Sequence, residues 1–101
     1  MVNCIKNEKR SSKRRKFKKP VYVEQSILEN QNPKVIKYVC QGIDISQNGI
    51  GLISKHYLKE GSIVRVIFFP TKKEEEFFTF AKTVWSKKIH GSYRVGLNFL
   101  S

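Results

Sequence analysis

The sequence predicts an all-β protein whose antiparallel sheet closes into a small barrel or sandwich. Three observations support this fold class. Short runs rich in β-branched and aromatic residues recur along the chain, turn-forming residues separate them, and no stretch keeps a helical period over three turns. With 101 residues, the chain is long enough for one such domain and too short for two.

The first predicted strands follow Pro20. Residues 21–28 (VYVEQSIL) and 35–43 (VIKYVCQGI) flank residues 29–34 (ENQNPK), which have the composition of a hairpin loop. Residues 44–54 (DISQNGIGLIS) are a polar turn that leads into a short apolar strand. At most a single helical turn is expected after it, around residues 56–60.

The remaining strands are predicted at residues 62–69 (SIVRVIFF), 76–87 (EFFTFAKTVWSK) and 92–100 (SYRVGLNFL). Pro70 ends the first of these, because proline removes a donor from the ladder. His90 and Gly91 form the turn between the last two. Large aromatic side chains are most often buried, so the core is expected to contain Phe78, Phe80, Trp85 and Phe99. An exposed platform of these side chains for base stacking is not expected.

Charge divides the chain into two parts. The formal net charge is +12, and residues 1–20 alone carry nine basic residues and one acid. Residues 1–19 have no apolar period and repel one another, so they are expected to be a mostly disordered, flexible basic arm. Residues 20–101 are expected to be the barrel. Such asymmetry indicates an anionic partner: nucleic acid, nucleotide, membrane surface or acidic protein.

Several function classes find no support in the sequence. Cys4 and Cys40 lack the spacing of a metal site and are expected to be reduced thiols. No nucleophile with a base beside it and no glycine-rich phosphate loop is present, so neither catalysis nor a cofactor is expected. No apolar stretch has the length of a signal peptide or a membrane helix, which predicts a cytoplasmic protein without membrane insertion.

Two constellations of residues could carry a function. The first is the basic cluster at residues 13–19 (KRRKFKK), next to the first strand. The second is a D-x-S-x-x-G turn formed by Asp44, Ser46 and Gly49. Each has an ordinary reading, because a basic run is often a solvated tail, and Asp, Ser and Gly are common turn residues.

In this order, the two constellations resemble the PilZ domain family, which has an RxxxR motif before its first strand and a D/N-x-S-x-x-G motif after it. Three further segments are similar to the family: residues 58–61 (LKEG) before a strand, 81–85 (AKTVW) and 93–99 (YRVGLNF). The resemblance spans about residues 14–100. It implies a six- to seven-stranded antiparallel barrel of the split-barrel type, whose arginine arm folds over cyclic di-GMP.

The resemblance also implies roles for the two constellations. Arginine forks match guanine O6 and N7 or two phosphate oxygens, and their planes stack on bases. Asp44 can accept from guanine N–H groups or orient an arginine, Ser46 can donate to a phosphate or base, and Gly49 permits close approach. The candidate ligand-binding residues are Arg10, Arg14, Arg15, Lys19, Asp44, Ser46 and Gly49.

One departure from the family pattern leaves the register of the arginine motif open. Aligned on Phe17, the pattern places Lys19 where the family has its final arginine, and lysine lacks the bidentate fork. A literal RxxxR also occurs at Arg10–Arg14, but it lies early relative to Phe17. The Arg15/Lys19 register is favoured.

The leading hypothesis is a non-enzymatic cyclic di-GMP receptor that signals to another, unidentified protein. A second is a PilZ-fold adaptor that does not bind cyclic di-GMP, which Lys19 favours. A third is a small basic barrel that binds nucleic acid. The sequence shows no aromatic-rich stacking motif of the kind found in such barrels, so nucleic acid is not the expected partner.

Overall fold

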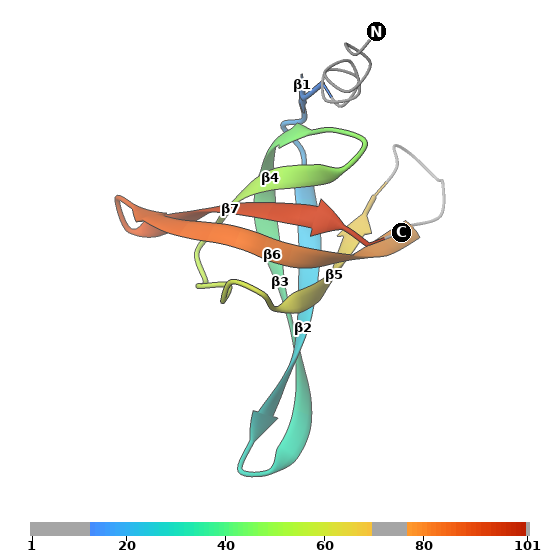
Figure 1. The fold of residues 1–101 in the computed structure, drawn as a ribbon. Helices are drawn as coiled ribbons and strands as arrows, with labels where there is room; N and C mark the ends of the chain where they lie inside the picture. The colour runs from blue at the N-terminus through green and yellow to red at the C-terminus, as the bar shows by residue number, and fades with distance from the viewer. Residues whose placement is uncertain (1–12, 70–76, 101) are drawn as a thin grey trace, which may run out of the picture.

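The computed structural model describes residues 13–69 and 77–100, which form one antiparallel sheet. Its strands are β1 (Arg15–Lys16), β2 (Pro20–Glu29), β3 (Asn32–Ile45), β4 (Gly49–Ser54), β5 (Ile63–Phe68), β6 (Phe77–Ile89) and β7 (Ser92–Phe99). The sheet runs in the order β1-β3-β2-β5-β6-β7-β4, and pairing of β3 with β4 closes six of these strands into a barrel (Figure 1). The structure therefore confirms the predicted all-β barrel, with β1 as one extra strand.

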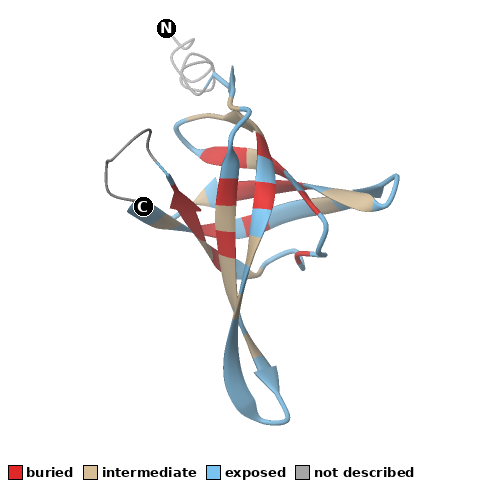
Figure 2. Cartoon of the chain, turned by 180° about the vertical axis from the view of Figure 1, so that it is seen from behind, coloured by how far each residue is buried: buried red, intermediate tan, exposed pale blue. Residues whose placement is uncertain are grey.

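Alternation along each strand builds the core. Inward positions carry small or branched apolar side chains, and outward positions are mostly polar or partly exposed, as expected of strands with one face in a core. Figure 2 shows this as short buried segments inside the barrel. The core cluster consists of Val21, Val23, Cys40, Ile50, Leu52, Leu58, Val64, Val66, Phe68, Ala81, Val95 and Leu97.

The β2–β3 hairpin is longer than the sequence suggested. The predicted loop at residues 29–34 shrinks to Asn30 and Gln31, which have φ values of 54° and 68°. Two consecutive residues with positive φ form a tight turn whose twist matches that of the strands. Consequently the hairpin continues past the barrel, and its distal half is exposed (Figures 1 and 2).

The connection from β4 to β5 contains no helical turn, although the sequence allowed one at residues 56–60. The Ser54 hydroxyl donates to the carbonyl of His56 (2.7 Å) and accepts from its N–H (2.9 Å), which fixes a bend instead. Leu58 then enters the core and is fully buried. Side-chain bonding to the local backbone thus replaces helical hydrogen bonds here.

The expectation that the large aromatics fill the core was wrong for Phe78, Phe80 and Trp85. All three are exposed on the outside of the barrel, and only Phe99 packs against the core. The inward positions of β6 are taken by smaller residues such as Ala81 and Thr83, since a small barrel leaves little interior space. A β-bulge between Thr83 and Trp85 shifts the register, so that Trp85 lies opposite Gly96 on the outer face.

The end of the basic arm lies against the sheet. Arg15 and Lys16 form β1 and pair with Ile45 and Asp44 of β3, so the arm joins the sheet before residue 20. Phe17 is the reason, because its ring packs against the core while its neighbours stay in solvent. Residues 1–12 lie outside the described part of the chain.

Candidate functional site

The arm reaches its place by crossing β3 at Gly42. The N–H of Phe17 donates to the carbonyl of Ile43 (2.9 Å), and the N–H of Gly42 donates to the carbonyl of Lys19 (2.8 Å). A Cβ on Gly42 would lie 2.6 Å from the Phe17 ring and 2.8 Å from the Lys19 oxygen. Glycine is therefore needed at this crossing. The Phe17 ring meets Phe68 edge-on, with the ring centroids 6.0 Å apart.

This crossing brings the two sequence motifs together. One guanidinium nitrogen of Arg14 (Nη1) donates to Oδ1 of Asp44 at 3.0 Å, which joins the arm to β3. Both side chains are partly exposed, so the ion pair by itself contributes little stability. Of the two roles suggested for Asp44, orienting an arginine is the one that the geometry displays.

The D-x-S-x-x-G turn is held by its own backbone. The N–H of Ser46 donates to the carbonyl of Gly49 (2.8 Å), and the Ser46 hydroxyl accepts from the N–H of Asn48 (3.2 Å). A Cβ on Gly49 would collide with the carbonyl oxygen of Leu97 on β7. Gly49 thus permits close contact between β4 and β7, and Ser46 keeps its hydroxyl proton for another acceptor.

An open depression of about 770 Å³ lies between the arm and this turn. Three consecutive basic residues form one side, and the turn forms the other. Its lining residues are Lys13, Arg14, Arg15, Ile45, Ser46 and Gln47. The volume is that of a small-molecule site, and the charge of its walls suits an anion.

A row of small residues extends this surface across the barrel. Cross-strand partners point to the same face of a sheet, and the register places Asp44 opposite Gly51, Gly51 opposite Gly96, and Gly96 opposite Trp85. The carboxylate of Asp44 covers Gly51, and the indole of Trp85 lies over Gly96. The absence of a Cβ at these two glycines lets the acidic group and the aromatic ring lie close against the sheet.

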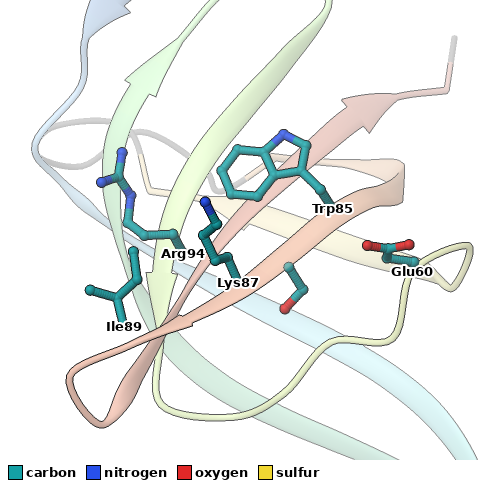
Figure 3. Close-up of a pocket in the computed structure, with 6 residues that line it drawn as sticks. Glu60, Trp85, Lys87, Ile89 and Arg94 are labelled. Atoms are coloured by element: carbon teal, nitrogen blue, oxygen red, sulfur yellow. The ribbon is translucent and has the colours of Figure 1, made fainter.

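Cations gather at the Trp85 end of the row. Figure 3 shows Trp85 and Lys87 of β6 and Arg94 of β7 on one side of the sheet, with Glu60 on the facing loop. They border a second depression of about 570 Å³. The hydroxyl oxygen of Ser86 in its wall is buried and has no hydrogen-bond partner among the described residues.

The structure brings together four of the seven candidate residues: Arg14, Arg15, Asp44 and Ser46. Gly49 acts through the backbone, and the exposed side chain of Lys19 does not line the depression. Arg10 lies outside the described residues. Sequence reasoning missed Lys13, Ile45, Gln47 and Trp85. Lys13 stood within the basic cluster, but no sequence signal marked Trp85, whose place depends on the register of four strands.

Burial shifts the pKa values of a thiol and a phenol on β3. Burial raises the pKa of the Cys40 thiol from 9.0 to about 11, although a hydrogen bond with Ser54 opposes the shift. Burial, and then the charge of Cys40, raise the pKa of Tyr38 above its usual value. Within residues 13–69 and 77–100, no group of His, Cys, Asp and Glu side chains could hold a metal ion. In that same part of the chain, no helix has the length and apolar character needed to cross a membrane.

Comparison with known proteins agrees with this geometry. No curated protein matches the chain. The family model of the PilZ domain, in contrast, matches residues 8–101, which include residues 8–19 of the arm, the D-x-S-x-x-G turn and all strands of the barrel. This match confirms the resemblance seen in the motifs. The chain belongs to the PilZ domain family, a family of cyclic di-GMP-binding domains.

Proposed function

We propose that this protein is a cyclic di-GMP receptor that holds the dinucleotide between its arginine-rich arm and the D-x-S-x-x-G turn. The observation that carries the proposal is the Arg14–Asp44 ion pair, which joins the two motifs beside a basic depression. In this proposal, the bound receptor passes its state to another protein.

The side chains around the depression match the chemistry of this ligand. Cyclic di-GMP presents two anionic phosphates and two guanines. Arg14 and Arg15 offer planar forks for phosphate oxygens or for O6 and N7 of guanine. Asp44 positions Arg14 and offers a second oxygen to guanine N–H groups, while the Ser46 hydroxyl donates to a phosphate or base.

Trp85 gives the second guanine a place to stack. The strand register aligns the exposed indole with Asp44 on one face of the sheet, across Gly51 and Gly96. Stacking of a base on an aromatic ring is worth about 1–3 kcal/mol. Trp85 is also the single tryptophan of the chain, so its fluorescence reports directly on occupancy of this surface.

One observation favours the alternative of an adaptor that does not bind cyclic di-GMP. Lys19 stands where the family pattern has arginine, and its side chain is exposed and does not line the depression. If the final arginine of the motif is required for affinity, this chain has lost that contact. The PilZ fold would then serve protein recognition alone.

A second observation keeps nucleic acid as a competitor in any test. The sequence shows no aromatic-rich stacking motif, yet Phe78, Phe80 and Trp85 are exposed on the barrel. Exposed aromatic rings beside basic residues are typical of surfaces that stack single-stranded bases. A single-stranded oligonucleotide is therefore the right comparison ligand.

Titration calorimetry and Trp85 fluorescence with cyclic di-GMP test the proposal. Binding should be saturable, and Arg15→Ala or Asp44→Ala should each weaken it about ten- to a hundredfold, since a hydrogen bond to a charged group contributes about 1.5–3 kcal/mol. Lys34→Ala is the matched control, because Lys34 forms a comparable exposed ion pair (3.1 Å, with Glu29) in the β2–β3 hairpin.

Three results would overturn it. Absence of heat and of any fluorescence change at high ligand concentration would leave the adaptor. Equal losses in the Lys34→Ala control and the Arg15→Ala variant would mean that binding follows overall charge and not this site. Stronger binding of the oligonucleotide than of cyclic di-GMP would support the nucleic-acid barrel.

A further inference from the structure

The depression beside Trp85 lies three strands across the sheet from Asp44. Its volume is about 570 Å³, and an acid, an exposed aromatic ring and two cations border it together with two further residues. The lining residues are Glu60, Trp85, Ser86, Lys87, Ile89 and Arg94. This volume is that of a small-molecule site. We call this space the Trp85 depression.

Two cations of the Trp85 depression lie directly opposite each other. The register pairs Lys87 of β6 with Arg94 of β7, on the same face as Trp85 and about 7 Å further along the strand (Figure 3). Like charges in opposite positions of neighbouring strands destabilise a sheet. No described carboxylate forms an ion pair with either cation, and residues 77–99 contain four basic residues and no acid. An anionic group of a ligand would relieve this repulsion.

Glu60 lies on a turn that is fixed to the barrel. The N–H of Ser62 donates to the carbonyl of Lys59 (3.0 Å), and Gly61 has the positive φ (89°) that the third position of a type II turn requires. The N–H of Gly61 donates to the carbonyl of Thr83 (2.7 Å), and the N–H of Thr83 donates to the carbonyl of Ser62 (2.8 Å). The turn therefore holds Glu60 beside β6.

Glu60 is the one acid among the described residues that has no cation partner. The other three each form an ion pair of 3.1 Å or less: Glu24, Glu29 and Asp44. Glu60 stays unpaired although two cations border the same depression. Figure 3 shows Glu60 on one side of Trp85, and Lys87 and Arg94 on the other. Opposite charges are thus held apart, with an aromatic ring between them.

We propose that the Trp85 depression binds a guanosine phosphate. The base stacks on Trp85, which is 43% exposed, and its N1–H and amino group donate to the Glu60 carboxylate. The phosphate lies between Lys87 and Arg94. Guanine presents two neighbouring donors on one edge, which suits a group that only accepts. Adenine presents an acceptor in place of N1–H, so its edge would face the carboxylate with like polarity.

A guanosine phosphate can come from two sources. One is a free mononucleotide, whose binding does not require the arm, because Glu60, Lys87 and Arg94 have no part in the arm site. The other is the second half of the cyclic di-GMP that the arm holds. In that case the inference rests on the proposed function and adds Glu60 as the residue that selects guanine.

Titration of GMP and of AMP, followed by the fluorescence and the indole N–H chemical shift of Trp85, tests the proposal. GMP should bind at least about fivefold more tightly than AMP. Glu60→Gln should remove this preference, because an amide both donates and accepts. Lys87→Ala or Arg94→Ala should weaken GMP about two- to fivefold, as expected of exposed charge contacts. Lys88→Ala is the matched control, because Lys88 is an exposed neighbour that does not line the depression.

Cyclic di-GMP, titrated into Glu60→Gln, tells the two sources apart. A loss equal to that of GMP means that the second half of the dinucleotide occupies the depression. Unchanged affinity means that the depression takes a free mononucleotide. If GMP binds as expected and cyclic di-GMP does not bind at all, the proposed function fails and the mononucleotide site stands.

Any of three results would exclude a guanosine phosphate site. One is a fluorescence and an indole shift that stay unchanged at millimolar GMP. Another is equal binding of GMP and AMP to the wild-type chain, which would mean that Glu60 does not read the base. The third is an equal loss in Lys88→Ala and Lys87→Ala, which would assign binding to overall charge.

Discussion

A single methyl group added at Gly42 should separate the arm from the barrel. Alanine causes no backbone strain there, because Gly42 is not among the residues with positive φ. Its Cβ would, however, lie 2.6 Å from the Phe17 ring and its carbonyl oxygen, and 2.8 Å from the carbonyl oxygen of Lys19. These atoms belong mainly to backbone and an aromatic ring, so the arm has to move away from β3.

The structure sets the size of the effect. Moving the arm breaks two backbone hydrogen bonds, between Phe17 and Ile43 and between Gly42 and Lys19. Each contributes about 0.5–1.5 kcal/mol. Phe17 is half-buried, and exposing it costs about 1 kcal/mol more. Binding of cyclic di-GMP then has to return the arm to its path against β3, which costs a total of about 2–4 kcal/mol. This cost lowers the affinity for cyclic di-GMP about 30- to 700-fold.

Calorimetry with cyclic di-GMP on Gly42→Ala measures this loss, and amide exchange of residues 15–19 measures detachment of the arm. Phe17→Ala should act in the same direction with a smaller effect, because it removes packing without a clash. Val39→Ala, an exposed change on the same strand, is the control. A folded Gly42→Ala variant that binds with wild-type affinity would refute the view that the path of the arm forms the site.

Three further changes test separate features. Lys19→Arg should tighten cyclic di-GMP binding, because a planar fork replaces a point charge, whereas Arg10→Ala should have little effect. Calorimetry measures both variants. A large loss of affinity in Arg10→Ala with no change in Lys19→Arg would show that Arg10–Arg14 is the functional register. Folding favours the neutral thiol of Cys40, whose pKa rises from 9.0 to about 11. The contribution of Cys40 to the free energy of unfolding should therefore be fully present below pH 9 and be lost as pH rises from 9 to 11. Cys40→Ala should flatten this fall in urea titrations, and an unchanged slope would assign it to other groups. Gln31→Gly should raise the unfolding free energy by about 1 kcal/mol. Gln31 has a φ of 68°, and this left-handed conformation costs a residue with a Cβ about 1–2 kcal/mol. A lower melting temperature of the variant would contradict this.

The strands could be predicted because their alternation is local, but their ends could not. Residues 29–34 contain Asn, Pro and no Gly, which suggested a loop. The structure instead makes a two-residue turn from Asn30 and Gln31, both at positive φ. Because the strands around the turn pair from Glu29 and Asn32 onward, the hairpin extends past the barrel and its distal half is exposed.

Side-chain direction was harder to predict on β6. Its two parities both contain apolar residues, and large aromatics of both parities, Phe78, Phe80 and Trp85, were expected in the core. The barrel interior accepts Ala81 and Thr83, while Phe78 and Phe80 stay outside. The β-bulge beside Trp85 adds a change of register that no local pattern shows.

The candidate site could be predicted in part for the same reason. Asp44 and Ser46 belong to one six-residue motif, and the basic cluster is a continuous run of the sequence. The motif and the basic cluster come together only because the arm crosses β3 at Gly42, and β3 is distant from the arm in the sequence. The position of Trp85 beside this site depends on how β3, β4, β7 and β6 pair, and the sequence alone does not show that pairing.

The salt dependence of binding separates a specific site from adsorption on a basic protein. A net charge of +12 attracts any anion, so affinity alone does not identify the ligand. A single-stranded nucleic acid that contacts six phosphates releases counterions with a slope of about −4 in log K against log salt, which is about a 300-fold loss from 50 to 200 mM.

Cyclic di-GMP has only two phosphates, so the same rule limits its loss to about sevenfold. Its remaining affinity would come from guanine contacts with Arg15, Asp44 and Trp85, which salt screens weakly. We therefore expect the two titrations, followed by Trp85 fluorescence, to diverge as salt rises. Equal and steep slopes would mean that the basic arm collects phosphates without recognising guanine, and the depression between arm and turn would then not be a dinucleotide site.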